Sequence, residues 1–208
     1  MLRELTVNDF VLELGSNSAA PGGGSVAALA AAQAAALFEM VARLTVQNKK
    51  YEAVREEMEG YIKELEAKRD EFIALIDKDA NSFNGVMAAF KLPKETPEEK
   101  AARTATIQSE YKNAANVPLS VGLKAMELLS YGPVLIEKGN SNAITDVGVG
   151  LLNLKLAVTG AFYNVKINLG SIKDEAYVEE TKKTMAEALE KVTSTVDPLV
   201  AKVESALE

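Results

Sequence analysis

The sequence has neither cysteine nor histidine among its 208 residues. The lack of cysteine excludes disulfide bonds, thiolate catalysis and thiolate-based zinc or iron–sulfur sites, and it is typical of a reducing compartment. Because histidine is the only side chain that ordinarily titrates near neutral pH, proton transfer here must use Asp, Glu, Lys or Tyr with a shifted pKa. A metal would need oxygen ligands alone, and no acidic cluster has calcium-loop spacing, so we expect no metal site.

Basic residues are in the minority. The chain has 23 Lys and Arg against 30 Asp and Glu, a formal net charge of -7. This balance argues against non-specific binding to nucleic acid or to anionic membranes. The first ten residues lack the basic-then-apolar pattern of a secretion signal, and no uninterrupted stretch of 18 apolar residues is present to span a bilayer. These absences predict a cytoplasmic protein without a nucleic-acid or membrane partner.

Helical periodicity dominates the remaining signal, and runs of alternating β-branched residues are nearly absent. We therefore expect an all-α, up-and-down bundle of long, kinked helices. No internal repeat or linker divides the chain, so residues 1–208 are expected to form a single domain. The expected helices cover residues 6–15, 25–46, 51–90, 96–138, 145–168 and 174–207, with kinks at Pro118 and Pro198 and a kink or an end at Gly132-Pro133.

A glycine loop, Pro21-Gly22-Gly23-Gly24-Ser25, opens onto a helix with an alanine-rich face, and Ser25 is the expected N-cap. Three consecutive glycines let backbone N–H groups approach a ligand at a helix N-terminus, which favours anions. The loop lacks the GxxxxGK[ST] pattern of a nucleotide-binding P-loop. By itself the loop fits ligand binding and a flexible connection between tightly packed helices equally well.

Asp79 lies on the apolar stripe of the helix expected over residues 51–90, three residues after Ile76 and four before Phe83. A buried carboxylate is costly unless it is paired, so Asp79 is either ion-paired in the core or kept for proton transfer with a raised pKa. Periodicity alone favours the structural pair. Asp77 could share a site with Asp79 only if the helix were distorted, because residues two apart point in different directions.

The helix expected over residues 145–168 has a small, polar face beside an ordinary apolar stripe. Such a face accommodates a neighbouring helix, or its asparagines bind a planar heterocyclic amide. The basic residues Lys91 and Lys94 are near these features in sequence, and taken alone they indicate solvated surface charge. The small, polar face consists of Asp146, Gly150, Asn153, Ala157, Ala161, Asn164 and Asn168.

Four segments together resemble the formiminotetrahydrofolate cyclodeaminase and methenyltetrahydrofolate cyclohydrolase family. They are SAAPGGGSVAALAAA, LIDKDANSFNGVMAAFKLPKETPEEKAAR, GNSNAITDVGV and NVKINLGSIKDEAY, and they occur in the family's order between Leu5 and Glu180. The family includes the C-terminal domain of the bifunctional formiminotransferase-cyclodeaminase and stand-alone bacterial proteins.

The resemblance implies an all-α fold, a homodimer built on helix packing, and folate chemistry in a cleft at or near the dimer interface. It implies that the catalytic acid lies in the segment Asp77-Lys78-Asp79. We expect Asp79 to be the proton shuttle because of its inward direction, with Asp77 as the alternative. The other family motifs imply folate contacts from Pro21, Gly22, Gly23, Gly24, Ser25, Lys91, Lys94, Asn142, Asp146, Asn164 and Asn168.

The expected function is therefore formiminotetrahydrofolate cyclodeaminase, which closes a ring and releases ammonia to give methenyltetrahydrofolate. One carboxylate can act first as base and then as acid, so no cofactor beyond the tetrahydrofolate substrate is expected. One alternative is methenyltetrahydrofolate cyclohydrolase, which starts from the same methenyl cation. Another is a catalytically silent helical dimer that binds folate or a protein partner. A separate formiminotransferase is a candidate partner for the enzyme.

Overall fold

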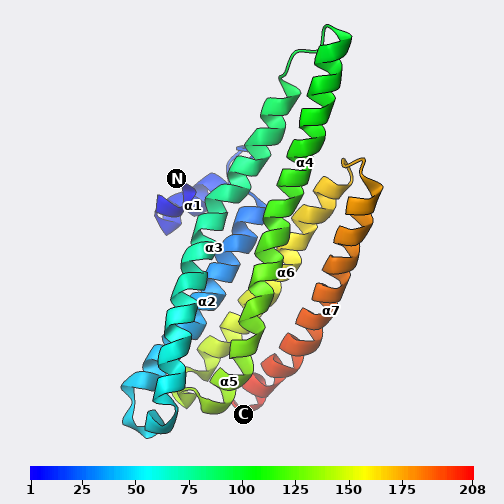
Figure 1. The fold of residues 1–208 in the computed structure, drawn as a ribbon. Helices are drawn as coiled ribbons and strands as arrows, with labels where there is room; N and C mark the ends of the chain where they lie inside the picture. Colours follow the sequence, from blue (N-terminus) through cyan, green and yellow to red (C-terminus); the bar gives the residue numbers. More distant parts are fainter.

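The computed structural model describes residues 1–208, and every regular element in it is a helix (Figure 1). This confirms the predicted all-α class. The five long helices are α2 (Gly23–Gln47), α3 (Arg55–Phe90), α4 (Pro97–Ala125), α6 (Ile144–Leu169) and α7 (Glu175–Ser205). The shorter elements are α1 (Val7–Leu14), α5 (Tyr131–Lys138) and the 3-10 helices η1 (Leu2–Glu4), η2 (Lys49–Val54), η3 (Met126–Ser130) and η4 (Ser141–Ala143).

Helices α2 and α6 run side by side through the middle of the bundle. Helix α3 packs on α2, α4 packs on α3 and α6, and α7 packs on α6. The α3–α4 hairpin is longer than the others and projects beyond the turn between α6 and α7 (Figure 1). Helix α1 lies at the margin of the bundle, and of its residues only Phe10 is buried. The bundle therefore has one projecting end, and the glycine loop lies on that side of the molecule.

Small residues allow the central helices to approach closely. The alanines of α2 are almost entirely buried, which fits the tight packing expected from the sequence. Gly150 of α6 faces the ring of Phe38, and Gly122 of α4 faces the ring of Phe162, with too little room for a side chain at either position. Ala157 and Ala161 are fully buried as well. The middle of the small, polar face therefore serves helix packing.

Helix ends follow local capping signals, with some exceptions. Thr6 caps α1, and Thr96 caps α4 in a capping box with Glu99, as expected. The prediction that Ser25 caps the second helix is wrong, because α2 begins two residues earlier with Gly22 at the N-cap. Pro118 lies inside α4, and the regular α-helix gives way to a 3-10 segment only at residues 126–130.

A buried ionic cluster ties α2 to α3. Glu39 of α2 is 5% exposed and accepts hydrogen bonds from Arg43 Nε at 2.7 Å and from an Arg69 terminal nitrogen at 2.6 Å. Both carboxylate oxygens are thus satisfied by guanidinium groups, the geometry that a buried carboxylate requires. This cluster fixes α3 against the middle of α2, some turns away from the glycine loop.

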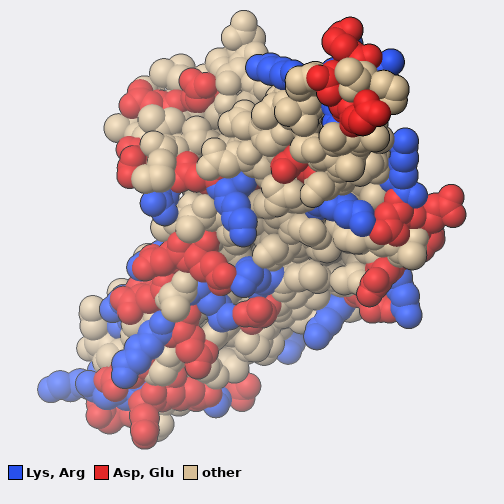
Figure 2. All heavy atoms as spheres, turned by 45° about the horizontal axis from the view of Figure 1, so that its top comes forward, with Lys and Arg blue, Asp and Glu red and all other residues tan.

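Three helical stretches are long and apolar enough, by length and composition, to cross a membrane: Gly23–Gln47, Pro97–Lys138 and Ser141–Leu169. Length and composition therefore do not exclude a membrane span, contrary to the sequence analysis. In the most apolar window, which lies in Gly23–Gln47, 67% of the residues are buried inside the bundle. On the face shown in Figure 2, acidic and basic side chains intermix, without a large patch of one sign.

The close approach of α6 to α2 predicts opposite effects for two glycine substitutions. A Cβ at Gly150 would lie 2.5 Å from the buried Phe38 ring, whereas a Cβ at Gly60 on α3 meets nothing within 4 Å. Gly150→Ala should lower the free energy of unfolding by about 1–3 kcal/mol. Gly60→Ala should raise it by about 0.5–1 kcal/mol, because alanine favours an exposed helix. Urea unfolding measures both, and equal effects would contradict this packing.

Candidate functional site

A pocket of about 310 Å³ lies where the first turn of α2 meets α3, α4 and the C-terminal end of α6. Helix α3 supplies the one ionisable side chain in its wall, and the other walls are small, apolar or amide side chains. The pocket is lined by Ala19, Ala20, Gly22, Gly23, Gly24, Asp79, Ala80, Ser82, Phe83, Ala114, Asn164, Ile167 and Asn168. The structure thus brings the glycine loop, Asp79 and two of the predicted asparagines together.

Asp79 lies directly against the first turn of α2. Its Oδ2 is 3.1 Å from the Ser25 hydroxyl, and a Cβ added to Gly24 would be 2.1 Å from its Oδ1. Gly24 is therefore required by the approach of the carboxylate, because any side chain there would overlap it. Ser82, one turn further along α3, donates to the backbone oxygen of Asp79 at 2.7 Å.

Two opposing effects set the proton affinity of Asp79. Burial raises the pKa of its carboxyl group, and the Ser25 hydroxyl and backbone amide offset part of that rise; the net pKa is above the ordinary value. No basic side chain contributes to the shift. The ion pair that periodicity alone favoured is therefore not formed, and the pocket favours the neutral acid more than water does.

Asn164 and Asn168 form the wall of the pocket opposite Asp79's helix. Asn164 Nδ2 donates to the Gly160 carbonyl at 2.9 Å, and Asn168 Nδ2 donates to the carbonyls of Asn164 and Ala114 at 2.9 and 3.0 Å. These bonds fix both amide groups and leave their carbonyl oxygens without a protein donor. The oxygens can accept hydrogen bonds from N–H groups of a ligand.

Asp77 points to a different place. Its Oδ1 accepts a 2.6 Å hydrogen bond from the Leu2 backbone N–H, and its Oδ2 lies 3.4 Å from Arg3 Nε. It lines a separate hollow of about 470 Å³ under the N-terminal segment. Asp77 thus anchors η1 to α3, whereas Asp79 faces the pocket.

The remaining predicted residues do not line this pocket. Pro21 is buried beside it, and Ser25 lies behind Asp79. Lys91 and Lys94 are exposed in the turn of the α3–α4 hairpin, where Lys91 is 12 residues, or about 18 Å of helix, beyond Asp79. Asp146 lies in the first turn of α6, about 27 Å from Asn164 along the helix, and Asn142 lies in η4 just before α6.

A second polar cluster surrounds Asn142 at that far end. The Ser141 backbone N–H donates to the Tyr51 hydroxyl at 3.0 Å, and the two hydroxyl groups lie 3.2 Å apart. These hydrogen bonds lower the pKa of Tyr51. Lys50 lies over the Tyr51 ring at 5.3 Å. Tyr51 was not among the predicted site residues, because its hydrogen-bond partner Ser141 is 90 residues away in the sequence.

Sequence reasoning also missed several walls of the pocket itself. Phe83 follows Asp79 by one helical turn, and Ile167 lies between the two asparagines, so spacing could have suggested both. Ala114 has no distinctive sequence signal, and only the crossing of α4 over α6 places its carbonyl near Asn168.

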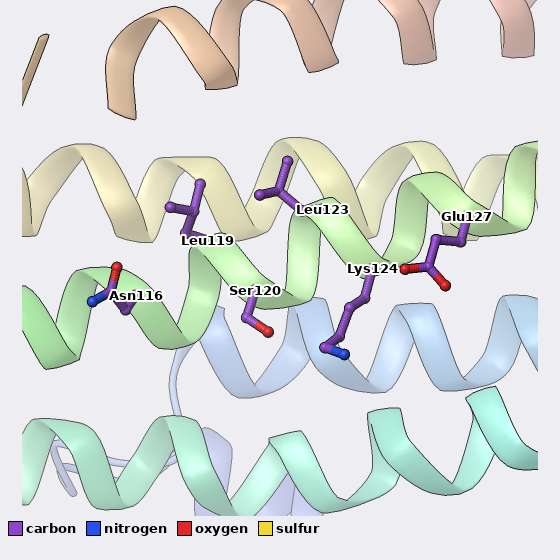
Figure 3. Close-up of a pocket in the computed structure, with 6 residues that line it drawn as sticks. All are labelled: Asn116, Leu119, Ser120, Leu123, Lys124 and Glu127. Atoms are coloured by element: carbon purple, nitrogen blue, oxygen red, sulfur yellow. The ribbon is translucent and has the colours of Figure 1, made fainter. Parts of the chain in front are cut away.

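Another hollow, of about 370 Å³, lies along the outside of α4 (Figure 3). Its charged groups are already paired with α3: Lys124 Nζ is 2.6 Å from Glu71, and Glu127 contacts Lys68. All six residues that line it, Asn116, Leu119, Ser120, Leu123, Lys124 and Glu127, come from consecutive turns of α4 and η3. It therefore lacks the convergent, unpaired polar groups of the Asp79 pocket.

The chain is similar to known proteins over most of its length. A family model described as formiminotransferase-cyclodeaminase matches residues 6–187. A solved structure of formiminotetrahydrofolate cyclodeaminase from Thermotoga maritima superimposes with a TM-score of 0.80 at 30% identity, covering 100% of this chain and 98% of that one.

Two relatives differ in length and in their described activity. A methenyltetrahydrofolate cyclohydrolase from Methylorubrum extorquens is 38% identical over 180 residues, which cover 86% of each chain. A formimidoyltransferase-cyclodeaminase from Gallus gallus is 40% identical over 181 residues. The match covers 87% of this chain and 34% of that relative, so the present chain corresponds to about a third of the bifunctional protein.

The environment of Asp79 predicts a pH-dependent cost to stability. Because its pKa is raised in the folded state, the folded protein binds this proton more tightly than the unfolded chain does. The contribution of Asp79 to stability is thus greatest below the ordinary Asp pKa and falls as the pH rises through the raised value. Asn does not titrate, so Asp79→Asn should gain stability relative to wild type over that interval. Urea unfolding of both proteins between pH 4 and 8 measures the difference, and a constant difference would contradict the assignment.

Proposed function

Because the chain belongs to the formiminotransferase-cyclodeaminase family, whose members act on folate derivatives, we propose that it converts formiminotetrahydrofolate into methenyltetrahydrofolate with release of ammonia. The observation that supports this most is Asp79: a partly buried carboxyl group with a raised pKa and no cationic partner, in a pocket with amide oxygens. In a chain without histidine, such a group is the best available proton shuttle.

The chemistry needs one group that takes a proton and then returns it. A folate nitrogen attacks the carbon of the protonated formimino group, which becomes an amino group, and Asp79 takes the proton that the attacking nitrogen loses. The acid then gives a proton to the departing amino group, the carbon–nitrogen bond breaks, and ammonia leaves. The product is a cyclic amidinium cation, which the re-formed carboxylate stabilises electrostatically. Asn164 and Asn168 are proposed to hold the heterocycle through its N–H groups, and Gly22 to Gly24 to contact it through the backbone.

The Methylorubrum relative favours methenyltetrahydrofolate cyclohydrolase as the second candidate, because its length is close to that of this chain. In that reaction water attacks the methenyl carbon and Asp79 accepts a proton from the water. The same pocket serves both reactions, since both pass through the methenyl cation. The non-enzymatic alternative, a helical dimer that binds folate or a protein partner without chemistry, needs no carboxyl group of raised pKa.

We also propose that two copies of the chain pack through α2 and α6. The outer face of α6 exposes apolar side chains along its whole length, and Met40 and Leu44 of α2 are exposed as well. Surfaces of this kind mark protein interfaces. The exposed apolar residues of α6 are Val149, Leu152, Leu156, Tyr163 and Ile167, which are 49–75% exposed, and Leu156 lies near the middle of the helix.

A two-fold axis near Leu156 would place the second copy antiparallel on this face. The Asn142 and Asp146 end of one subunit would then lie beside the Asp79 pocket of the other, because the two polar ends lie at opposite ends of α6. The second copy would thus bring together family motifs that lie far apart within a single chain. A separate formiminotransferase remains a proposed partner, and the cytoplasm the proposed compartment.

Turnover by Asp79→Asn and Asp77→Asn tests the function. Asp79→Asn should lose at least about 100-fold in kcat on formiminotetrahydrofolate or methenyltetrahydrofolate, because general acid–base catalysis contributes on that scale. Asp77→Asn should release the N-terminal segment and keep most of the turnover. Methenyl absorbance follows both reactions, while ammonia release identifies cyclodeaminase and formyl product identifies cyclohydrolase. Absence of both activities in the wild type would exclude the enzymatic proposal.

Mixing two inactive variants tests the shared interface. Asp79→Asn and Asp146→Asn should each have low activity, but a 1:1 mixture with exchanged subunits should recover about one quarter of wild-type activity, because half of the dimers then hold one intact site. Labelling one variant with ¹⁵N gives the two subunits different masses, so that native mass spectrometry verifies the exchange. A monomeric wild type, or exchanged dimers without recovery, would contradict the antiparallel arrangement.

A further inference from the structure

Ser25 is fully buried and has two hydrogen-bond partners of different kinds. Its Oγ lies 3.1 Å from Asp79 Oδ2 and 3.1 Å from the backbone oxygen of Ile76. Ile76 is one turn before Asp79 on α3, so both partners come from the same face of that helix. The family motif suggested a folate contact for Ser25, but its hydroxyl is turned toward α3 and it does not line the pocket.

A serine hydroxyl has one proton and can accept through its oxygen. The Ile76 carbonyl can only accept, whereas a carboxyl group accepts when ionised and donates when protonated. When Asp79 is ionised, Ser25 can donate to Oδ2 in a charge-assisted hydrogen bond. When Asp79 is protonated, the acid can donate to the Ser25 oxygen while the serine proton turns to the Ile76 carbonyl. Each protonation state of Asp79 therefore has a fully satisfied arrangement.

We propose that Ser25 is a positioning residue whose hydroxyl rotates between Asp79 and the Ile76 carbonyl as the carboxyl group loses and gains its proton. The rotation keeps Asp79 in one place in both states, so a single acid can serve the base step and the acid step without moving. The two arrangements follow from the contacts of Ser25 alone. The role rests on the proposed function only for the order in which the two arrangements form during the reaction.

Ser25 is the one side chain that hydrogen-bonds the Asp79 carboxyl group. The pocket walls from α2, α4 and α6 have no ionisable group. On α3, Asp77 is engaged by Leu2 and Arg3, and Lys78 is exposed. Glu110 of α4 faces Gly85, almost two turns beyond Asp79. Burial raises the pKa of Asp79 and Ser25 lowers it, and no charged group of the N-terminal segment is among the causes.

The test compares Ser25→Ala with Ser82→Ala. Ser25→Ala removes the donor to the ionised carboxylate, so the acidic limb of the kcat profile should move up by about one pH unit. It should also lower kcat with little change in KM, because the hydroxyl does not line the pocket. Ser82 contacts only the backbone oxygen of Asp79, so Ser82→Ala should leave the position of that limb unchanged.

A carboxyl ¹³C NMR titration gives a readout that does not depend on turnover. With the Asp79 signal assigned by its loss in Asp79→Asn, the pKa of Asp79 should be higher in Ser25→Ala than in wild type. An unchanged or lower pKa would overturn the role of Ser25, as would equal shifts in both serine variants. If the wild type turns over neither substrate while the NMR shift is present, the proposed function fails and the hydroxyl's role stands.

Discussion

The site depends on one contact, the approach of the Asp79 carboxylate to the first turn of α2. The missing side chain at Gly24 makes the approach sterically feasible, since a Cβ there would overlap Oδ1. Burial disfavours the ionised form of Asp79, and the Ser25 hydroxyl and backbone amide compensate in part. The carboxyl group is thus held by neutral donors. An ion pair in their place would lower its pKa and keep it ionised.

The rest of the bundle makes this contact rigid. Alanines on α2 and glycines on α4 and α6 bring the helices close, so that large rings such as Phe38 fill the spaces beside them. The Glu39 cluster fixes α3 against α2 further along both helices. Because each helix is stiff, the Glu39 cluster also fixes the part of α3 that holds Asp79 against the first turn of α2.

The arrangement of the family motifs separates two kinds of residue. Asp79, the glycine loop and the two asparagines converge within one chain, whereas Asn142 and Asp146 lie at the other end of α6. The apolar face of α6 runs between these two ends. In the proposed antiparallel pair, packing on this face would bring the Asp146 end of one subunit to the Asp79 pocket of the other. One exposed face would then serve both assembly and the completion of the pocket.

The sequence by itself determined the all-α class, most helix ends and the inward direction of Asp79, because periodicity and capping are local properties of the chain. It could not decide between Asp77 and Asp79, since their partners come from η1 and from α2. It misjudged Ser25 for the same reason: whether a serine caps its own helix or contacts another depends on which helix lies opposite. Only the tertiary structure decided that Ala114 lines the pocket and that Asp146 is far from it. The spacing of residues in the sequence predicts the direction of a side chain around its own helix axis. It does not predict which helix lies opposite, because the crossing of two helices is set by packing along the whole length of both.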